Sequence, residues 1–179
     1  IWIDLLRGSE DNKACLTFKM INILATRIII TNPKIKDLLQ MTYSHVFLDE
    51  FQDTTDLQYD LVKACFLNGD SIVTAVGDNK QRIMEWAGAR KTIFLDFQKD
   101  FNSDKVSLIM NHRSAPRLVD LQKRMYESLG ENELEAHPSD KWSFDDGEIK
   151  LFISSDEKAE AERIVSDIVK KISIGVKVD

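Results

Sequence analysis

Apolar residues recur at helical spacing through residues 16–30, which predicts a largely buried helix there. The β-branched run at residues 28–31 leaves a strand as an alternative for its last part. An Asn-Pro pair at residues 32–33 ends the segment, and a short second helix is predicted at residues 34–41. The positions that carry the first pattern are Leu16, Met20, Leu24 and Ile28.

Three apolar runs that end in polar residues predict strands, at residues 44–48, 71–76 and 106–110. Continuous apolar runs are typical of parallel strands that are buried on both faces. Helical patterns follow two of the three runs. The sequence therefore predicts an α/β fold, a parallel sheet with flanking helices.

Capping residues mark where two helices begin after these strands. Thr55 and Gln58 have the spacing of a capping box, and Gly69 is expected to end the helix that follows. Ser114 is expected to cap the next helix, and Gly130 to close it. The apolar face of that helix is predicted to hold Leu118, Leu121, Met125 and Leu129.

A change in composition divides the chain into domains. Residues 131–147 are polar and acidic and are predicted to be a linker between residues 1–130 and residues 148–179. The last segment opens with an alternating pattern that predicts a strand at residues 148–153. Its helix is expected to be capped by one of the two serines that follow, Ser154 or Ser155.

Composition narrows the class of protein. Of 179 residues, 43% are hydrophobic and 30% charged, which is typical of a globular protein, and no apolar run reaches the ~20 residues that a membrane span needs. Cys15 and Cys65 are expected to be buried free thiols of a reducing, cytoplasmic compartment. The net charge of −6 argues against a broad basic nucleic-acid surface. Because the chain starts at Ile1, it has the character of an internal fragment.

The first group of chemical interest lies at residues 45–54, where the apolar run ends in two adjacent carboxylates. Open α/β folds bind ligands at the carboxyl ends of their strands. Asp49 is suited to hold a divalent cation, and Glu50 to take a proton from a water molecule. The alternative is an ordinary strand that ends in a polar turn.

A second polar group lies at residues 76–89, directly after the second predicted strand. Gly77 allows a tight turn, Gln81 can offer its amide to a phosphate oxygen, and Trp86 presents a flat face on which a base can stack. The alternative is a polar loop that Trp86 anchors to the core.

The third group follows the predicted strand at residues 106–110. Arg113 is placed to put its guanidinium on a developing phosphate charge. The alternatives are a salt bridge from Arg113 to the region of Asp49 and Glu50, and a surface histidine at His112.

In order and spacing, these groups resemble three motifs of the UvrD/Rep-type superfamily 1 DNA helicases. Asp-Glu-Phe-Gln-Asp-Thr at residues 49–54 resembles the Walker B element (motif II), residues 76–89 resemble motif III, and residues 111–114 resemble motif IV. The resemblance implies a RecA-like sheet, incomplete here, that comprises the later part of domain 1A and the start of domain 2A. It further implies a helicase that uses ATP and Mg²⁺ and moves on single-stranded DNA.

The resemblance also implies a role for each matching residue. Asp49 would hold the metal, Glu50 and Arg113 would be catalytic, and Trp86 would contact DNA. Contacts with the nucleotide would come from Gln52, Asp53, Gln81 and His112. The chain departs from the family pattern in Met84, where an aromatic is usual, in Ala87, where an arginine is usual, and in His112, where a tyrosine is usual.

Two other functions remain open at this stage. One is a non-catalytic relative that keeps the fold as a binding or assembly module. The other is a Mg²⁺-dependent nuclease that uses Asp49, Glu50 and Asp53, with Asp78 as a further ligand. The sequence contains no Gly-x-x-x-x-Gly-Lys-Ser/Thr phosphate loop. The chain by itself is therefore expected to be inactive.

Overall fold

The structure is a computed structural model that describes residues 6–8, 13, 15–128 and 136–176. The chain divides into two compact units, Ile1–Val106 and Ser107–Asp179. The fold is mixed α/β, with small parallel sheets and helices. None of the described helices is both long enough and apolar enough to cross a membrane.

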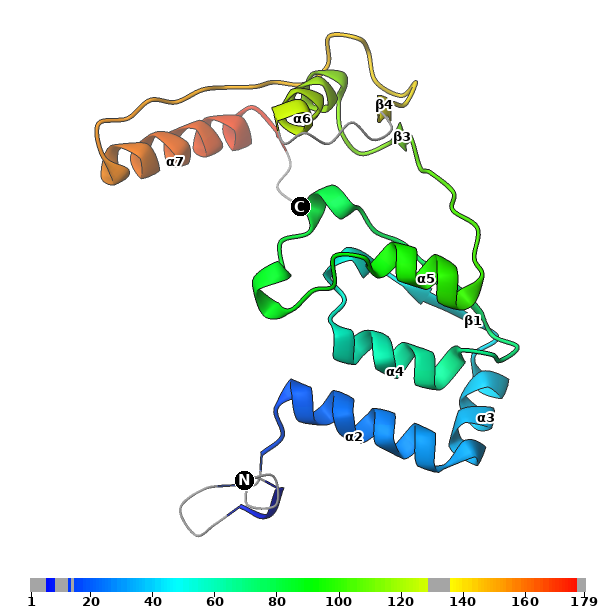
Figure 1. The fold of residues 1–179 in the computed structure, drawn as a ribbon. Coiled ribbons are helices and arrows are strands. Elements are labelled where there is room, and N and C mark those ends of the chain that lie inside the picture. The colour runs from blue at the N-terminus through cyan, green and yellow to red at the C-terminus, as the bar shows by residue number, and fades with distance from the viewer. Residues whose placement is uncertain (1–5, 9–12, 14, 129–135, 177–179) are drawn as a thin grey trace. The chain divides into compact units, whose positions relative to one another are not determined.

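Helix α2 (Phe18–Thr31) confirms a helix in the first predicted segment, and the alternative of a strand at residues 28–31 is wrong. The expectation that this helix is largely buried is also wrong, since Met20 is buried but Leu16 and Ile28 are exposed. The Thr17 side chain caps the helix by accepting a hydrogen bond from the Met20 backbone N–H at 3.3 Å. Helix α2 lies along α4 (Asp56–Phe66), and within the β-branched run Ile29 is buried whereas Ile28 and Ile30 are exposed (Figure 1). Helix α3 (Pro33–Thr42) confirms the second.

The capping box at the start of α4 is confirmed. The Thr55 backbone N–H donates to the Gln58 side-chain oxygen at 2.8 Å, and the Gln58 backbone N–H donates to the Thr55 hydroxyl at 3.5 Å. The predicted end of the helix is wrong by one residue. Asn68, with φ of 58°, adopts the left-handed conformation that was expected of Gly69. An Asn side chain tolerates that conformation better than most.

Strands β1 (His45–Leu48) and β2 (Ile72–Ala75) pair in parallel, with Leu48 beside Ala75, and confirm two of the predicted strands. Their side chains alternate between a half-buried and an exposed face. In the part of the chain that the structure describes, Phe47 is 74% exposed and Ile72 58% exposed. The prediction that these strands are buried on both faces is therefore wrong for the described residues.

The core of the first unit lies on the inner face of this sheet. Helix α4 and helix α5 (Ile93–Phe101) contribute to it, together with the 3₁₀ helix η1 (Phe51–Asp53). Four buried residues form its centre: Phe51, Tyr59, Ile93 and Phe97. The Phe51 ring contacts the rings of Tyr59, Phe94 and Phe97 edge-on, which is a favourable geometry for aromatic contacts. Phe51 is the residue that follows Glu50, so the core fixes the end of β1.

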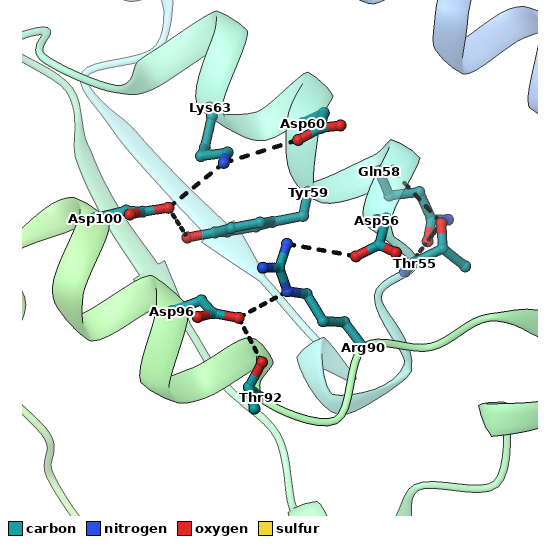
Figure 2. Close-up of polar contacts among 10 residues, drawn as sticks. All are labelled: Thr55, Asp56, Gln58, Tyr59, Asp60, Lys63, Arg90, Thr92, Asp96 and Asp100. Carbon is teal, nitrogen blue, oxygen red and sulfur yellow. Dashed lines mark hydrogen bonds and ion pairs between the residues drawn. The ribbon is translucent and has the colours of Figure 1, made fainter.

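Tyr59 brings a hydroxyl group into this core and uses it to join α4 to α5 (Figure 2). The residue is 0% exposed, and its hydroxyl donates to Asp100 Oδ2 at 3.0 Å. Lys63 pairs with the same carboxylate at 3.6 Å. Burial, and then the hydrogen bond to Asp100, raise the pKa of the Tyr59 hydroxyl well above its ordinary value of 10.0.

Tyr59→Phe is expected to lower the free energy of unfolding by about 1 kcal/mol, the usual net value of one hydrogen bond, because Asp100 keeps Lys63. The difference in free energy of unfolding between the wild type and Tyr59→Phe should become smaller as the pH rises above 10.0. There the unfolded wild-type chain loses the Tyr59 proton while the folded chain retains it, so the wild type loses stability that the variant never had. Urea unfolding followed by circular dichroism on both sides of this pH measures the difference.

Tyr43→Phe is the matched control, since Tyr43 is 52% exposed and lies outside the core. The control should leave stability unchanged at each pH. A Tyr59→Phe deficit that stays constant across the tyrosine range would contradict the pKa shift.

The third predicted strand, at residues 106–110, is wrong. Strand β3 (Met110–Asn111) has only two residues and pairs in parallel with β4 (His137–Pro138), in a sheet separate from β1 and β2. An apolar run becomes a strand only where a neighbour supplies hydrogen bonds. Residues 106–109 show no regular secondary structure.

Helix α6 (Pro116–Ser128) follows β3, but Ser114 is not its cap. Ala115 precedes the helix, and its carbonyl accepts the Leu118 and Val119 N–H groups. The Ser114 N–H instead donates to the Asn111 side chain at 2.8 Å. The expected end at Gly130, and Leu129 on the apolar face, lie outside the described residues.

The last segment differs from the prediction at its strand and at its cap. Residues 148–153 form no strand; the segment is held instead beside α7 (Glu157–Ser173) by Lys150–Asp167 and Lys171–Glu148 ion pairs at 3.0 and 2.5 Å. The helix is capped by Asp156, whose carboxylate accepts the Ala159 N–H at 2.9 Å, and not by either serine. A carboxylate at this position also gains from the helix dipole.

The two cysteines differ in burial. Both are free thiols, but Cys15 is exposed, which corrects the expectation that both are buried. Burial raises the pKa of the Cys65 thiol. The linker predicted at residues 131–147 stays a prediction. Residues 129–135 lie outside the described part of the chain, and β4 lies among residues 136–147.

Candidate functional site

The parallel pairing of β1 and β2 brings two of the polar groups to one edge of the sheet. The Val76 N–H donates to the Leu48 carbonyl at 2.8 Å, and the Phe51 N–H donates to the Val76 carbonyl at 2.9 Å. Asp49 and Glu50 therefore leave β1 beside the residues that leave β2. An open hollow borders this edge, and its lining includes Phe47, Asp49, Glu50, Asp53, Thr54 and Gln58.

The two carboxylates are exposed at the end of β1. Glu50 has φ of 48°, in the left-handed region that costs a residue other than glycine about 1–3 kcal/mol. The Asp49 carboxylate accepts the Glu50 backbone N–H at 2.9 Å. This hydrogen bond and the buried Phe51 hold the bend at the end of β1.

Gln52 and Asp53 are engaged within the protein. Gln52 is 1% exposed; its side-chain amide donates to Glu50 Oε2 at 2.7 Å, and its oxygen accepts the Asp78 backbone N–H at 3.0 Å. The Asp53 carboxylate accepts the Met84 backbone N–H at 3.2 Å. Both residues thus tie the end of β1 to the loop after β2.

The loop after β2 is organised around Asp78. Lys80 pairs with its carboxylate at 2.9 Å, and the Gln81 side-chain amide donates to it at 3.1 Å. Burial favours the neutral acid, but the hydrogen bonds from Lys80 and Gln81 together outweigh burial and hold the pKa of Asp78 below its usual value. Gln81, at the end of the 3₁₀ helix η2 (Asn79–Gln81), is therefore oriented by Asp78.

Trp86 stands out from the molecule on the 3₁₀ helix η3 (Glu85–Ala87). Its side chain is 83% exposed, so the alternative in which Trp86 anchors the loop to the core is wrong. Lys91 stabilises this helix through two contacts. Its ammonium group pairs with Glu85 at 2.5 Å, and its backbone carbonyl accepts a hydrogen bond from the Arg82 guanidinium at 3.0 Å. An aromatic face this open is free to stack on a planar ligand.

Arg90 anchors the far end of the loop (Figure 2). Its backbone N–H donates to the Thr54 carbonyl at 3.0 Å, and its guanidinium pairs with Asp96 at 2.7 Å and Asp56 at 3.4 Å. The guanidinium also lies over the Tyr59 ring, 5.6 Å from its centre. Sequence reasoning missed Arg90, because no local pattern reveals partners on two different helices.

His112 and Arg113 lie in the second unit, directly after β3. Both side chains are exposed, and the Arg113 backbone N–H donates to the Asn111 side chain at 2.9 Å. Asn111 accepts the Ser114 N–H as well, so its side chain shapes this turn. The turn presents the imidazole and the guanidinium to solvent.

The carboxylates do not form a cluster that encloses a metal. Within the described ranges, no group of three or more His, Cys, Asp or Glu side chains is arranged to hold an ion. Asp49 offers a single exposed carboxylate, which suits a Mg²⁺ ion that takes its remaining ligands from water and phosphate.

Comparison with known proteins shows the family to which the chain belongs. The family model for the UvrD/REP helicase N-terminal domain matches residues 5–102, more than half of the chain. The chain belongs to the UvrD/Rep helicase family. The match includes the acidic end of β1 and the loop that carries Gln81 and Trp86.

Several bacterial members of the family are similar to the chain. The ATP-dependent DNA helicase Rep of Buchnera aphidicola subsp. Acyrthosiphon pisum (strain APS) is 34% identical over 170 residues, which cover 87% of this chain and 24% of that protein. The Rep helicase of Escherichia coli (strain K12) is 28% identical, with 88% and 23% covered. The ATP-dependent DNA helicase PcrA of Bacillus subtilis (strain 168) is 32% identical, with 66% and 16% covered. The chain thus spans less than a quarter of the length of each.

Proposed function

We propose that the chain is part of a longer ATP-dependent DNA helicase that uses ATP and Mg²⁺ to move along single-stranded DNA. In this proposal residues 1–130 belong to a RecA-like domain 1A, and residues 148–179 begin domain 2A. The observation that carries the proposal is the acidic end of β1, held beside the loop after β2 in a chain of the UvrD/Rep family.

Asp49 and Glu50 have distinct roles in the proposed site. Mg²⁺ would neutralise charge on the phosphates, and Asp49 is the residue that would hold it. Glu50 would accept a proton from the attacking water at its carboxylate. The separate contacts of the two carboxylates support this division of roles: Asp49 accepts the Glu50 backbone N–H, whereas Glu50 accepts the Gln52 amide.

The remaining residues would bind the nucleotide and the DNA. Gln81 would contact the terminal phosphate from its position beside Asp78. Arg113 would stabilise charge on the same phosphate, and His112 would stack on the adenine. Gln52 and Asp53 would support the nucleotide site through the backbone contacts that they make.

Trp86 would stack on a base of the single strand, since its side chain is exposed on the loop that carries Gln81. In a longer protein that includes this chain, Trp86→Ala is expected to weaken binding of single-stranded DNA by about 1–3 kcal/mol, the usual value of one base–aromatic stack. Fluorescence anisotropy with a labelled oligonucleotide measures the affinity. Stimulation of ATP hydrolysis by DNA should fall in the same variant.

Phe144→Ala is the control, because Phe144 is an equally exposed aromatic that belongs to none of the three motifs. It should leave DNA affinity unchanged. If Trp86→Ala binds DNA as tightly as the unsubstituted protein, Trp86 has no role in DNA binding. If the longer protein hydrolyses no ATP even with DNA present, the chain belongs to a non-catalytic relative.

A further inference from the structure

Gln52 lies at the centre of a chain of hydrogen bonds that runs from Glu50 to Gln81. The Gln52 amide donates to Glu50 Oε2 at 2.7 Å, and its oxygen accepts the Asp78 N–H at 3.0 Å. The Asp78 carboxylate then accepts the Gln81 amide at 3.1 Å. Three hydrogen bonds thus connect the proposed base with the proposed phosphate contact.

We propose that Gln52 is a positioning residue, which orients the Glu50 carboxylate and at the same time fixes the loop that carries Gln81. This inference rests on the proposed function of Glu50. It differs from the role in nucleotide contact that the family resemblance implies for Gln52. A side chain that is 1% exposed, with its nitrogen and its oxygen both bonded within the protein, presents almost no surface to a ligand.

The physical reason for such a residue lies in the exposure of Glu50. A glutamate side chain on a surface samples several rotamers, and a general base acts only when its oxygen lies within reach of the proton. A hydrogen bond from a buried, immobile amide selects one rotamer before substrate binds. The same amide satisfies the Asp78 N–H, which would otherwise lose its hydrogen bond beside the core.

Gly77 shows that the space around Gln52 is closely fitted. A Cβ atom on Gly77 would lie 2.2 Å from the Gln52 side-chain oxygen, and 3.0 Å from both the Phe51 backbone nitrogen and the Phe94 ring. The φ angle of Gly77 is not positive, so a turn does not require glycine here. The sequence-based reason for Gly77 is therefore wrong: the position is small because the Gln52 amide fills the adjoining space.

Two variants test the proposal. Gln52→Met keeps the length of the side chain but removes the donor and the acceptor. Gly77→Ala keeps the Gln52 residue itself, but the added Cβ atom would push its amide out of position. Gln40→Leu is the matched control, since Gln40 also donates a hydrogen bond, to the Cys65 carbonyl at 2.8 Å, but lies away from the acidic edge.

Hydrogen exchange of the 179-residue chain gives the first measurement. The Asp78 backbone amide should exchange faster in Gln52→Met and in Gly77→Ala than in the unsubstituted chain, and at the normal rate in Gln40→Leu. An Asp78 amide that stays equally protected in both test variants would overturn the proposal, whatever the activity of the longer protein proves to be.

Steady-state ATP hydrolysis by a longer protein that includes this chain gives the second. Gln52→Met should lower kcat about 100-fold, the effect of misplacing a reacting group by about 1 Å, and leave the KM for ATP unchanged. The decisive arm combines Gln52→Met with Glu50→Gln. Because Gln52 is proposed to act partly through Glu50, the loss in the double variant should be clearly smaller than the product of the two single losses, and what remains is the part that acts through the loop of Gln81.

Losses that multiply in the double variant, or a raised KM with normal kcat, would show that Gln52 is a structural or nucleotide-contacting residue and would overturn the proposal. Near-normal turnover in Glu50→Gln alone would instead remove the proposed function, and the hydrogen-exchange result would still stand.

Discussion

Glu50→Gln is expected to lower ATP turnover by about 10²–10⁴-fold in a longer protein that includes this chain, the usual range for loss of a general base. Glutamine retains the size of the side chain and can still meet the Gln52 amide through its oxygen. It cannot accept a proton from water. The chemical step should therefore slow while the site keeps its shape. Steady-state phosphate release at saturating ATP and single-stranded DNA measures the loss.

ATP affinity should change little in this variant, because Glu50 is not the residue proposed to bind the metal or the phosphates. Titration with a fluorescent ATP analogue measures that affinity. Glu162→Gln provides the control: it makes the same chemical change on the exposed face of α7 and should leave turnover unchanged. Near-normal turnover in Glu50→Gln would remove Glu50 as the base.

The chain of 179 residues by itself is expected to release no phosphate from ATP above background. Phosphoryl transfer needs backbone N–H groups and a lysine around the β- and γ-phosphates, in addition to a metal and a base. The sequence contains no phosphate loop of that kind. Two exposed carboxylates and a net charge of −6 should repel the nucleotide, so at most a weakly held cation is expected near Asp49.

Isothermal titration of the purified chain with Mg²⁺ and with ATP tests binding, and a phosphate-release assay with single-stranded DNA tests turnover. A longer protein that supplies a phosphate loop is the positive control. Phosphate release by the chain that disappears in Glu50→Gln would show that these residues are a self-sufficient enzyme. Release that persists in Glu50→Gln would indicate a contaminating ATPase.

Much of the first unit can be predicted from the sequence, because local interactions determine it. The capping box of Thr55 and Gln58 joins residues three positions apart, and the structure contains both of its hydrogen bonds. Apolar patterns between residues close together in the sequence likewise predict the helices at residues 18–31 and 33–42 and the two paired strands. The family that the sequence resembles is likewise the one whose model matches residues 5–102.

Predictions that depend on a distant partner fail more often. The apolar run at residues 106–110 has the composition of a strand, yet only its last residue enters β3, whose partner lies at His137–Pro138. Residues 148–153 alternate like a strand but are held by ion pairs to α7. The Asp156 cap was missed because three adjacent residues can each cap a helix, and sequence alone does not choose among them.

The sequence by itself determined which residue types stand at the candidate site: two carboxylates after one strand, an amide and an aromatic after the next, and an arginine further on. Tertiary structure alone decided how they are held. Gln52 reaches Asp78, 26 positions away, and Tyr59 reaches Asp100, 41 positions away. Such contacts form only when packing brings distant segments together, and no periodic pattern records them. The residue types of the candidate site are thus given by the sequence, whereas their positions relative to one another depend on the fold.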